Sequence, residues 1–181
     1  MPVEADGPGA GQAGRAAAGV GKGTLFRRFG DRTGLIRAVF EARIEPLRQA
    51  VAEGPAPLGP AAAPRERVPA LLDAVLCFKL DHRHLSLALE EAGSGSPYQG
   101  AHYTWWHGLL RESLERLWGA EGREGKGAAA TDGDFAAHAL LAATRADLVE
   151  QLIGRDGMTR EGMRAQLAAF VGRVMGEGRT A

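Results

Sequence analysis

The sequence has a single cysteine, Cys77, and no apolar run that approaches the length of a membrane-spanning helix. One thiol cannot form an internal disulfide bond, so a disulfide-stapled secreted domain is excluded. Cys77 stands in an apolar run with no evident cationic neighbour, and we interpret it as a small buried residue. The first residues include Glu4 and Asp6 and lack the apolar core of a signal peptide. We therefore expect a cytoplasmic protein without a membrane partner.

The sequence also lacks an excess of charge, because 22 basic and 22 acidic residues give a net charge of zero. The charges are unevenly distributed. Residues 15–48 contain eight basic and three acidic side chains, so this segment carries +5 and the rest of the chain −5. A basic segment ahead of an acidic body favours contact with a polyanion, and a solvated basic helix face explains it equally well.

Strand-like alternation of useful length is missing, and the hydrophobic periodicity is helical throughout, which predicts an all-α fold. Residues 1–14 are poor in apolar side chains and are expected to be disordered. The predicted helices cover 22–29, where Gly30 ends the helix; 32 to about 53, with Asp31 as N-cap; 65–81; about 83–92; 99–118; 135 to about 153; and a final helix capped by Thr159. Residues 54–63 are a linker rich in proline and glycine.

Residues 18–35 (AGVGKGTLFRRFGDRTGL) combine a glycine turn, a short amphipathic helix and a second capped helix. Lysine and threonine near a helix N-terminus can hold phosphates, and arginine can bond guanine edges. The stretch resembles the turn and recognition helix of the TetR family of transcription regulators. The resemblance is specific over residues 18–47, whereas the body, residues 64–175, is similar to the family only in helix pattern and length.

The resemblance implies a helix-turn-helix DNA-binding head over residues 15–53 and a helical ligand-binding and dimerising body over residues 64–178. It implies that Lys22, Thr24 and Arg32 contact phosphates. Arg27, with Gly23 and Arg28, would approach the bases. Where the family has a tyrosine that bonds a phosphate, this chain has Phe26, which would only pack against sugar or the neighbouring helix.

The head departs from the family pattern upstream of the turn. The family has a first helix and a full second helix there, and no apolar first helix exists in residues 1–14. The head is therefore expected to be truncated, either because the natural start lies upstream or because this copy has degenerated.

Two further sites are expected in the body. The resemblance implies a cavity for a small-molecule effector, and the candidate lining residues are Phe78, His82, His102, Tyr103 and Trp106. Ordinary core packing is the competing interpretation, and we weight it slightly ahead. The resemblance also implies that the last two long helices form a homodimer interface. Its candidate residues are Leu141, Leu148, Leu152, Met163, Leu167, Phe170 and Val174. Core packing is again the alternative, and here we favour the dimer.

Other chemistries find little support. A phosphate-binding loop would need Gly at residue 16 and Ser or Thr at residue 23, and the chain has Ala16 and Gly23. Asp81, His82 and His84 could begin a metal site completed by His102, His107 or His138, but the spacing is unlike the strong metal patterns, so we favour polar helix-end histidines and expect no metal. No nucleophile–base pair or cofactor fingerprint is present, so we expect neither catalytic residues nor a cofactor.

The sequence thus predicts a ligand-responsive transcription regulator, a repressor that binds a pseudopalindromic double-stranded DNA operator as a homodimer. The alternative is a helical small-molecule sensor or dimerisation module that has lost specific DNA binding.

Overall fold

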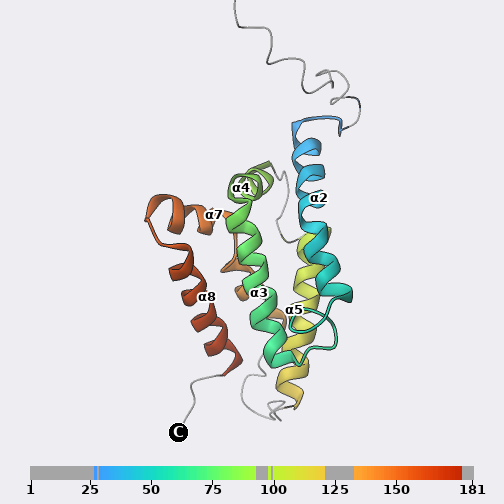
Figure 1. The fold of residues 1–181 in the computed structure, drawn as a ribbon, viewed down its shortest axis with the longest axis vertical. Coiled ribbons are helices and arrows are strands. Elements are labelled where there is room, and N and C mark those ends of the chain that lie inside the picture. Colours follow the sequence, from blue (N-terminus) through green and yellow to red (C-terminus); the bar gives the residue numbers. More distant parts are fainter. Residues whose placement is uncertain (1–26, 28, 93–97, 99, 121–132, 177–181) are drawn as a thin grey trace, which may run out of the picture.

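The computed structural model describes residues 27, 29–92, 98, 100–120 and 133–176, and every element in these ranges is helical. The elements are α2 (Arg32–Glu53), α3 (Pro64–Asp81), α4 (Arg83–Ala92), α5 (Ala101–Ala120), α6 (Gly133–Ala142), α7 (Ala146–Val149), the π-helix η2 (Glu150–Arg155) and α8 (Arg160–Met175). The predicted all-α class is confirmed. α3 runs through the middle of the molecule, with α8 on one side and α2 and α5 on the other (Figure 1).

The start of α2 agrees with the sequence. Gly30 has a φ of 75°, a left-handed conformation that glycine adopts without strain. Asp31 is the N-cap, and its carboxylate accepts a hydrogen bond of 2.7 Å from the N–H of Gly34. The helix then runs unbroken to Glu53, as predicted, with Pro46 inside it.

α2 is packed into the body. Phe40, Ile44 and Val51 of α2 are at most 2% exposed and belong to the same core cluster as the side chains of α3, α5 and α8. Because this burial removes the apolar face of α2 from water, the position of α2 is tied to that of the helices around it.

Residues 54–63 form no helix, as the proline and glycine content predicts, and a buried arginine fastens them to α2. Arg67 of α3 is 5% exposed. It donates hydrogen bonds of 3.1 Å to the carbonyl of Val51 and of 3.0 Å to the carbonyl of Leu58. The Val51 carbonyl lies in the last turn of α2, where no intrahelical donor reaches it, so Arg67 supplies the missing partner.

The helix predicted over residues 135 to about 153 is wrong, because the structure breaks it into α6, α7 and η2. The hydroxyl of the buried Thr144 donates to the carbonyl of Leu141 at 2.9 Å, and the backbone of Arg145 is extended. The N–H of Ala146 then donates to the carboxylate of Glu90 at 2.9 Å. The side chain that caps the N-terminus of α7 therefore comes from α4. The periodicity of residues 135–153 cannot predict a cap that comes from another helix.

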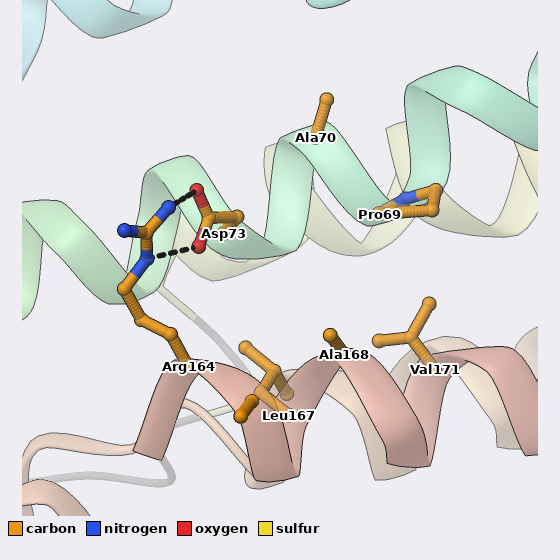
Figure 2. Close-up of a pocket in the computed structure, with 8 residues that line it drawn as sticks. Pro69, Ala70, Asp73, Arg164, Leu167, Ala168 and Val171 are labelled. Atoms are coloured by element: carbon orange, nitrogen blue, oxygen red, sulfur yellow. Dashed lines mark hydrogen bonds and ion pairs between the residues drawn. The ribbon is translucent and has the colours of Figure 1, made fainter. Parts of the chain in front are cut away.

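The last helix begins as predicted, with the hydroxyl of Thr159 accepting a 3.0 Å hydrogen bond from the N–H of Gly162. α8 lies along α3, and the two helices enclose a groove of about 450 Å³ (Figure 2). Arg164 of α8 closes one end of this groove by binding both carboxylate oxygens of Asp73 of α3, at 2.7 and 2.8 Å.

None of the helices in the described ranges combines the length and the apolar character that crossing a membrane requires.

Replacement of the buried arginine should destabilise the fold. In Arg67→Met, the buried carbonyl of Val51 and the partly buried carbonyl of Leu58 lose their donor, and we expect the free energy of unfolding in urea to fall by about 3 kcal/mol. Arg43→Met is the matched control, because Arg43 is an exposed arginine of α2, and it should change the stability by about 0.5 kcal/mol or less. Equal stabilities of the two variants would contradict the role of Arg67.

Candidate ligand-binding cavity

A cavity of about 580 Å³ lies between α2, α3, α4, α5 and the connection from α6 to α7. This volume is within the usual range for sites that take a small organic molecule. Its apolar wall includes Phe40, Val75, Leu89, Trp106 and Leu141. Charged side chains also line it: Arg37 and Glu41 from α2, Lys79 from α3, Glu90 from α4, and Arg145.

Aromatic rings form one side of the cavity. The ring of Phe40 meets that of His102 edge to face, with centroids 5.1 Å apart. Phe40 makes a similar contact with Phe78 at 5.3 Å, and His102 with Trp106 at 6.2 Å. Such edge-to-face contacts hold the rings in fixed orientations, so this wall is preorganised.

Three polar atoms in the lining are buried and have no hydrogen-bond partner in the described part of the chain. They are Oγ of Ser86, Nδ1 of His102 and Nε1 of Trp106. A buried polar atom without a partner costs about 1–3 kcal/mol, and native proteins have few of them. The side chains that carry these three atoms all belong to residues that line the cavity.

Three charged residues of the lining, Lys79, Glu90 and Arg145, are paired with one another. Nζ of Lys79 lies 3.0 Å from Oε1 of Glu90, and the guanidinium of Arg145 lies 3.5 Å from Oε2. Burial lowers the pKa of Lys79, and the neighbouring Glu90 opposes this shift. The Glu90 carboxylate also accepts hydrogen bonds from the N–H groups of α7, at 2.9 Å from Ala146 and 3.4 Å from Asp147.

His102 is uncharged at neutral pH. Burial, and to a smaller degree the positive charges of Lys79 and Arg48, lower its pKa from 6.5 to about 4. A neutral imidazole has one donor and one acceptor nitrogen, so His102 can meet either kind of group on a ligand.

The structure brings three of the five residues predicted for a ligand pocket, His102, Tyr103 and Trp106, into the lining of this cavity. Phe78 lies behind Phe40, and His82 packs on Phe78 with centroids 4.8 Å apart, so both support the wall from outside. Asp81, a candidate metal ligand in the sequence, is instead paired with Arg160 of α8.

Most residues predicted to contact DNA, namely Lys22, Gly23, Thr24, Phe26 and Arg28, lie outside the described residues. Arg27 and Arg32 are described, and both are exposed. Arg32 is the first residue of α2.

The residues predicted for a dimer interface fall into two groups. Leu141, Met163 and Leu167 are at most 7% exposed in a single chain, so they belong to its own core and have little surface left for a second copy. Leu148, Leu152, Phe170 and Val174 keep part of their surface exposed. A dimer interface over these four remains a prediction.

The sequence did not single out the polar lining residues Lys79, Ser86, Glu90 and Arg145. The only signal was that each lies on or beside the apolar stripe of its helix, where a polar side chain becomes partly buried. Periodicity indicates such burial, but not which helix a residue will face.

Comparison of the chain with protein-family models, with curated proteins and with solved structures found no match.

The two partners of the part-buried ion pair between Lys79 and Glu90 should differ in their effect on stability. Glu90→Ala leaves the ammonium of Lys79 buried without its partner and removes the cap of α7, so we expect a loss of about 3–5 kcal/mol in urea unfolding. Lys79→Met should cost less, because Glu90 keeps Arg145 and the N–H of Ala146. Glu91→Ala, at an exposed site on the same helix, is the control. The opposite order for Lys79→Met and Glu90→Ala would refute the capping role.

Buried His102 should make the stability sensitive to acid. Its folded pKa of about 4 lies below the 6.5 of an exposed histidine, so the unfolded chain binds the proton first as the pH falls below about 6.5. Between about pH 6.5 and about pH 5, this difference removes about 2 kcal/mol of stability. His102→Gln should lose this component of the pH dependence, whereas His84→Gln, at an exposed histidine, should retain it. Identical pH profiles for the two variants would show that His102 is not protected from protons.

Proposed function

We propose that this protein is a DNA-binding transcription regulator whose affinity for an operator is set by a small molecule bound in the cavity. The observation that carries the proposal is the cavity itself, which has a preorganised aromatic wall and whose lining residues include three with a buried polar atom that finds no partner among the described residues. The DNA-binding part rests on the resemblance of residues 18–47 to the TetR family and on the excess of basic residues in that part of the chain.

The cavity is well placed to influence the predicted head, because α2 contributes to both. Arg37, Phe40 and Glu41 line the cavity, and Arg32, a predicted phosphate contact, begins the same helix. A ligand that fits better when α2 is shifted would move the predicted recognition residues with it. The coupling is reciprocal, so DNA that holds α2 in place would weaken binding of the ligand by the same factor.

The lining selects the chemistry of the effector. The wall is mainly apolar and aromatic, and the indole N–H of Trp106 can only donate a hydrogen bond. Lys79 and Arg145 both pair with Glu90, and Glu41 pairs with Arg48. An apolar or aromatic small molecule with a hydrogen-bond acceptor placed against Trp106 therefore matches the cavity best.

DNA recognition would require a homodimer. Two heads related by a twofold axis would enter successive major grooves, about 34–36 Å apart, on a pseudopalindromic operator. The exposed parts of Leu148, Leu152, Phe170 and Val174 are the candidate contacts between the two copies.

The test is fluorescence anisotropy of the full chain with DNA from upstream of its own gene, at two salt concentrations and with competitor DNA. Specific binding that weakens with salt supports the regulator. Absence of specific binding to any upstream or selected DNA would reject it and favour the alternative, a small-molecule sensor or dimerisation module without DNA affinity.

Substitutions should separate base contacts from phosphate contacts. Arg27→Ala should relax the sequence preference by about 1–3 kcal/mol at one base pair, because a bidentate contact with a base is lost. Lys22→Ala should weaken binding to all sequences and reduce the salt slope by about one unit. Arg43→Ala removes an equal charge from an exposed site on α2 outside the predicted contacts and is the control. A salt slope in Lys22→Ala equal to that of Arg43→Ala would count against the phosphate contact.

A further inference from the structure

Beside the cavity, α5 and α6 bring two histidines and an aspartate together. Nε2 of His107 lies 3.4 Å from Oδ1 of Asp134, and Nε2 of His138 lies 3.8 Å from Oδ2 of the same carboxylate. All three residues can offer a ligand atom, and these atoms lie within 4.8 Å of one another. No other group of three such residues gathers in the parts of the chain that the structure describes.

We propose that His107, Asp134 and His138 bind a divalent first-row transition ion, with Zn²⁺ as the probe. Imidazole and carboxylate ligands suit these ions, and two histidines with one carboxylate form a known zinc ligand set. A tetrahedral ion with bonds of about 2.0–2.2 Å holds its ligand atoms about 3.4 Å apart. The 3.4 Å spacing of His107 and Asp134 matches this value, and the 3.8 Å spacing of His138 and Asp134 is somewhat longer.

The surroundings of His138 favour a metal ligand. Its other ring nitrogen, Nδ1, lies 2.6 Å from the hydroxyl of Tyr103. When Nε2 binds a metal, Nδ1 carries the proton and donates it in a hydrogen bond to this oxygen, which fixes the tautomer and the ring orientation. The rings of His107 and His138 are stacked, with centroids 4.0 Å apart and planes inclined by 29°, and the Nε2 atoms of both lie within 3.8 Å of the one carboxylate.

The site is open to ions from solvent. The side chains of Asp134 and His138 are 54% and 40% exposed, whereas that of His107 is 14% exposed. Three protein ligands leave a position for water or for a donor atom of another molecule. Tyr103 lines the cavity as well as supporting His138, so an ion would stiffen one wall of the cavity. The metal proposal itself stands whether or not the protein binds DNA.

The sequence indicates His107 and His138 only as residues that could complete a metal site begun by Asp81, His82 and His84, and it does not point to Asp134. His107 and His138 are 31 positions apart on different helices, and neither belongs to a short metal-binding motif. An arrangement in which a protonated histidine simply pairs with Asp134 has the same three residues, and metal titration separates the two.

The experiment is calorimetric titration of the full, tag-free and chelator-treated chain with ZnCl₂. We expect saturable uptake of one ion per chain. Titration with Co²⁺ should give the intense visible bands of a four-coordinate site, which octahedral surface-bound Co²⁺ does not give. Absence of saturable uptake would overturn the proposal and leave a histidine–aspartate ion pair.

Substitutions test whether the ion binds to these three residues. His138→Gln and Asp134→Asn each remove one ligand and should abolish both the uptake and the visible bands. Tyr103→Phe removes only the partner of Nδ1 and should weaken the affinity about 10–100-fold. His84→Gln, at an exposed histidine of α4 outside the group, should bind like the original chain. Because Asp134 is exposed, Asp134→Asn should fold normally, and undiminished uptake by this variant would overturn the assignment.

Discussion

The carboxylate of Glu90 lies where α3, α4 and α7 meet, and its interactions connect these three helices. It pairs with the buried ammonium of Lys79 from α3 and accepts hydrogen bonds from the first N–H groups of α7. A buried ion pair recovers the cost of desolvation only when further hydrogen bonds satisfy its remaining lone pairs, and here the N-terminus of α7 supplies them. The same contact explains why the chain between α6 and η2 turns instead of continuing as one helix.

The hydrogen bonds of Glu90 contrast with the lack of partners at other polar atoms of residues that line the same cavity, as far as the chain is described. The charged groups of Lys79 and Arg145 lie within 3.5 Å of the Glu90 carboxylate. Ser86, His102 and Trp106 also line the cavity, and each has a buried polar atom without a hydrogen-bond partner in the described parts of the chain. Burial of such atoms is costly, and their residues all line the space of about 580 Å³ that we propose as the small-molecule site.

α5 connects the two sites that we propose. His102 and Trp106 are four residues apart and face the cavity, and Tyr103 and His107 are also four apart and stack towards α6. These adjacent stripes follow from the 3.6-residue period of the helix. Tyr103 belongs to both, because it lines the cavity and contacts His138. An ion on one side of α5 and a small molecule on the other would therefore share one aromatic residue.

The sequence by itself determined the helices that depend on neighbours along the chain: the caps at Asp31 and Thr159, the break over residues 54–63, and the apolar stripes of α2, α3, α5 and α8. It also offered His102, Tyr103 and Trp106 as candidate lining residues, because the family resemblance implies a cavity and this helix mixes aromatic and polar side chains. The tertiary structure alone decided what lies opposite them. Glu90 caps a helix 56 residues away, Tyr103 meets His138 across 35 residues, and both contacts depend on how helices pack. Helical periodicity predicts which side chains share one face of a helix, whereas only the packing of the helices determines which residues that face contacts.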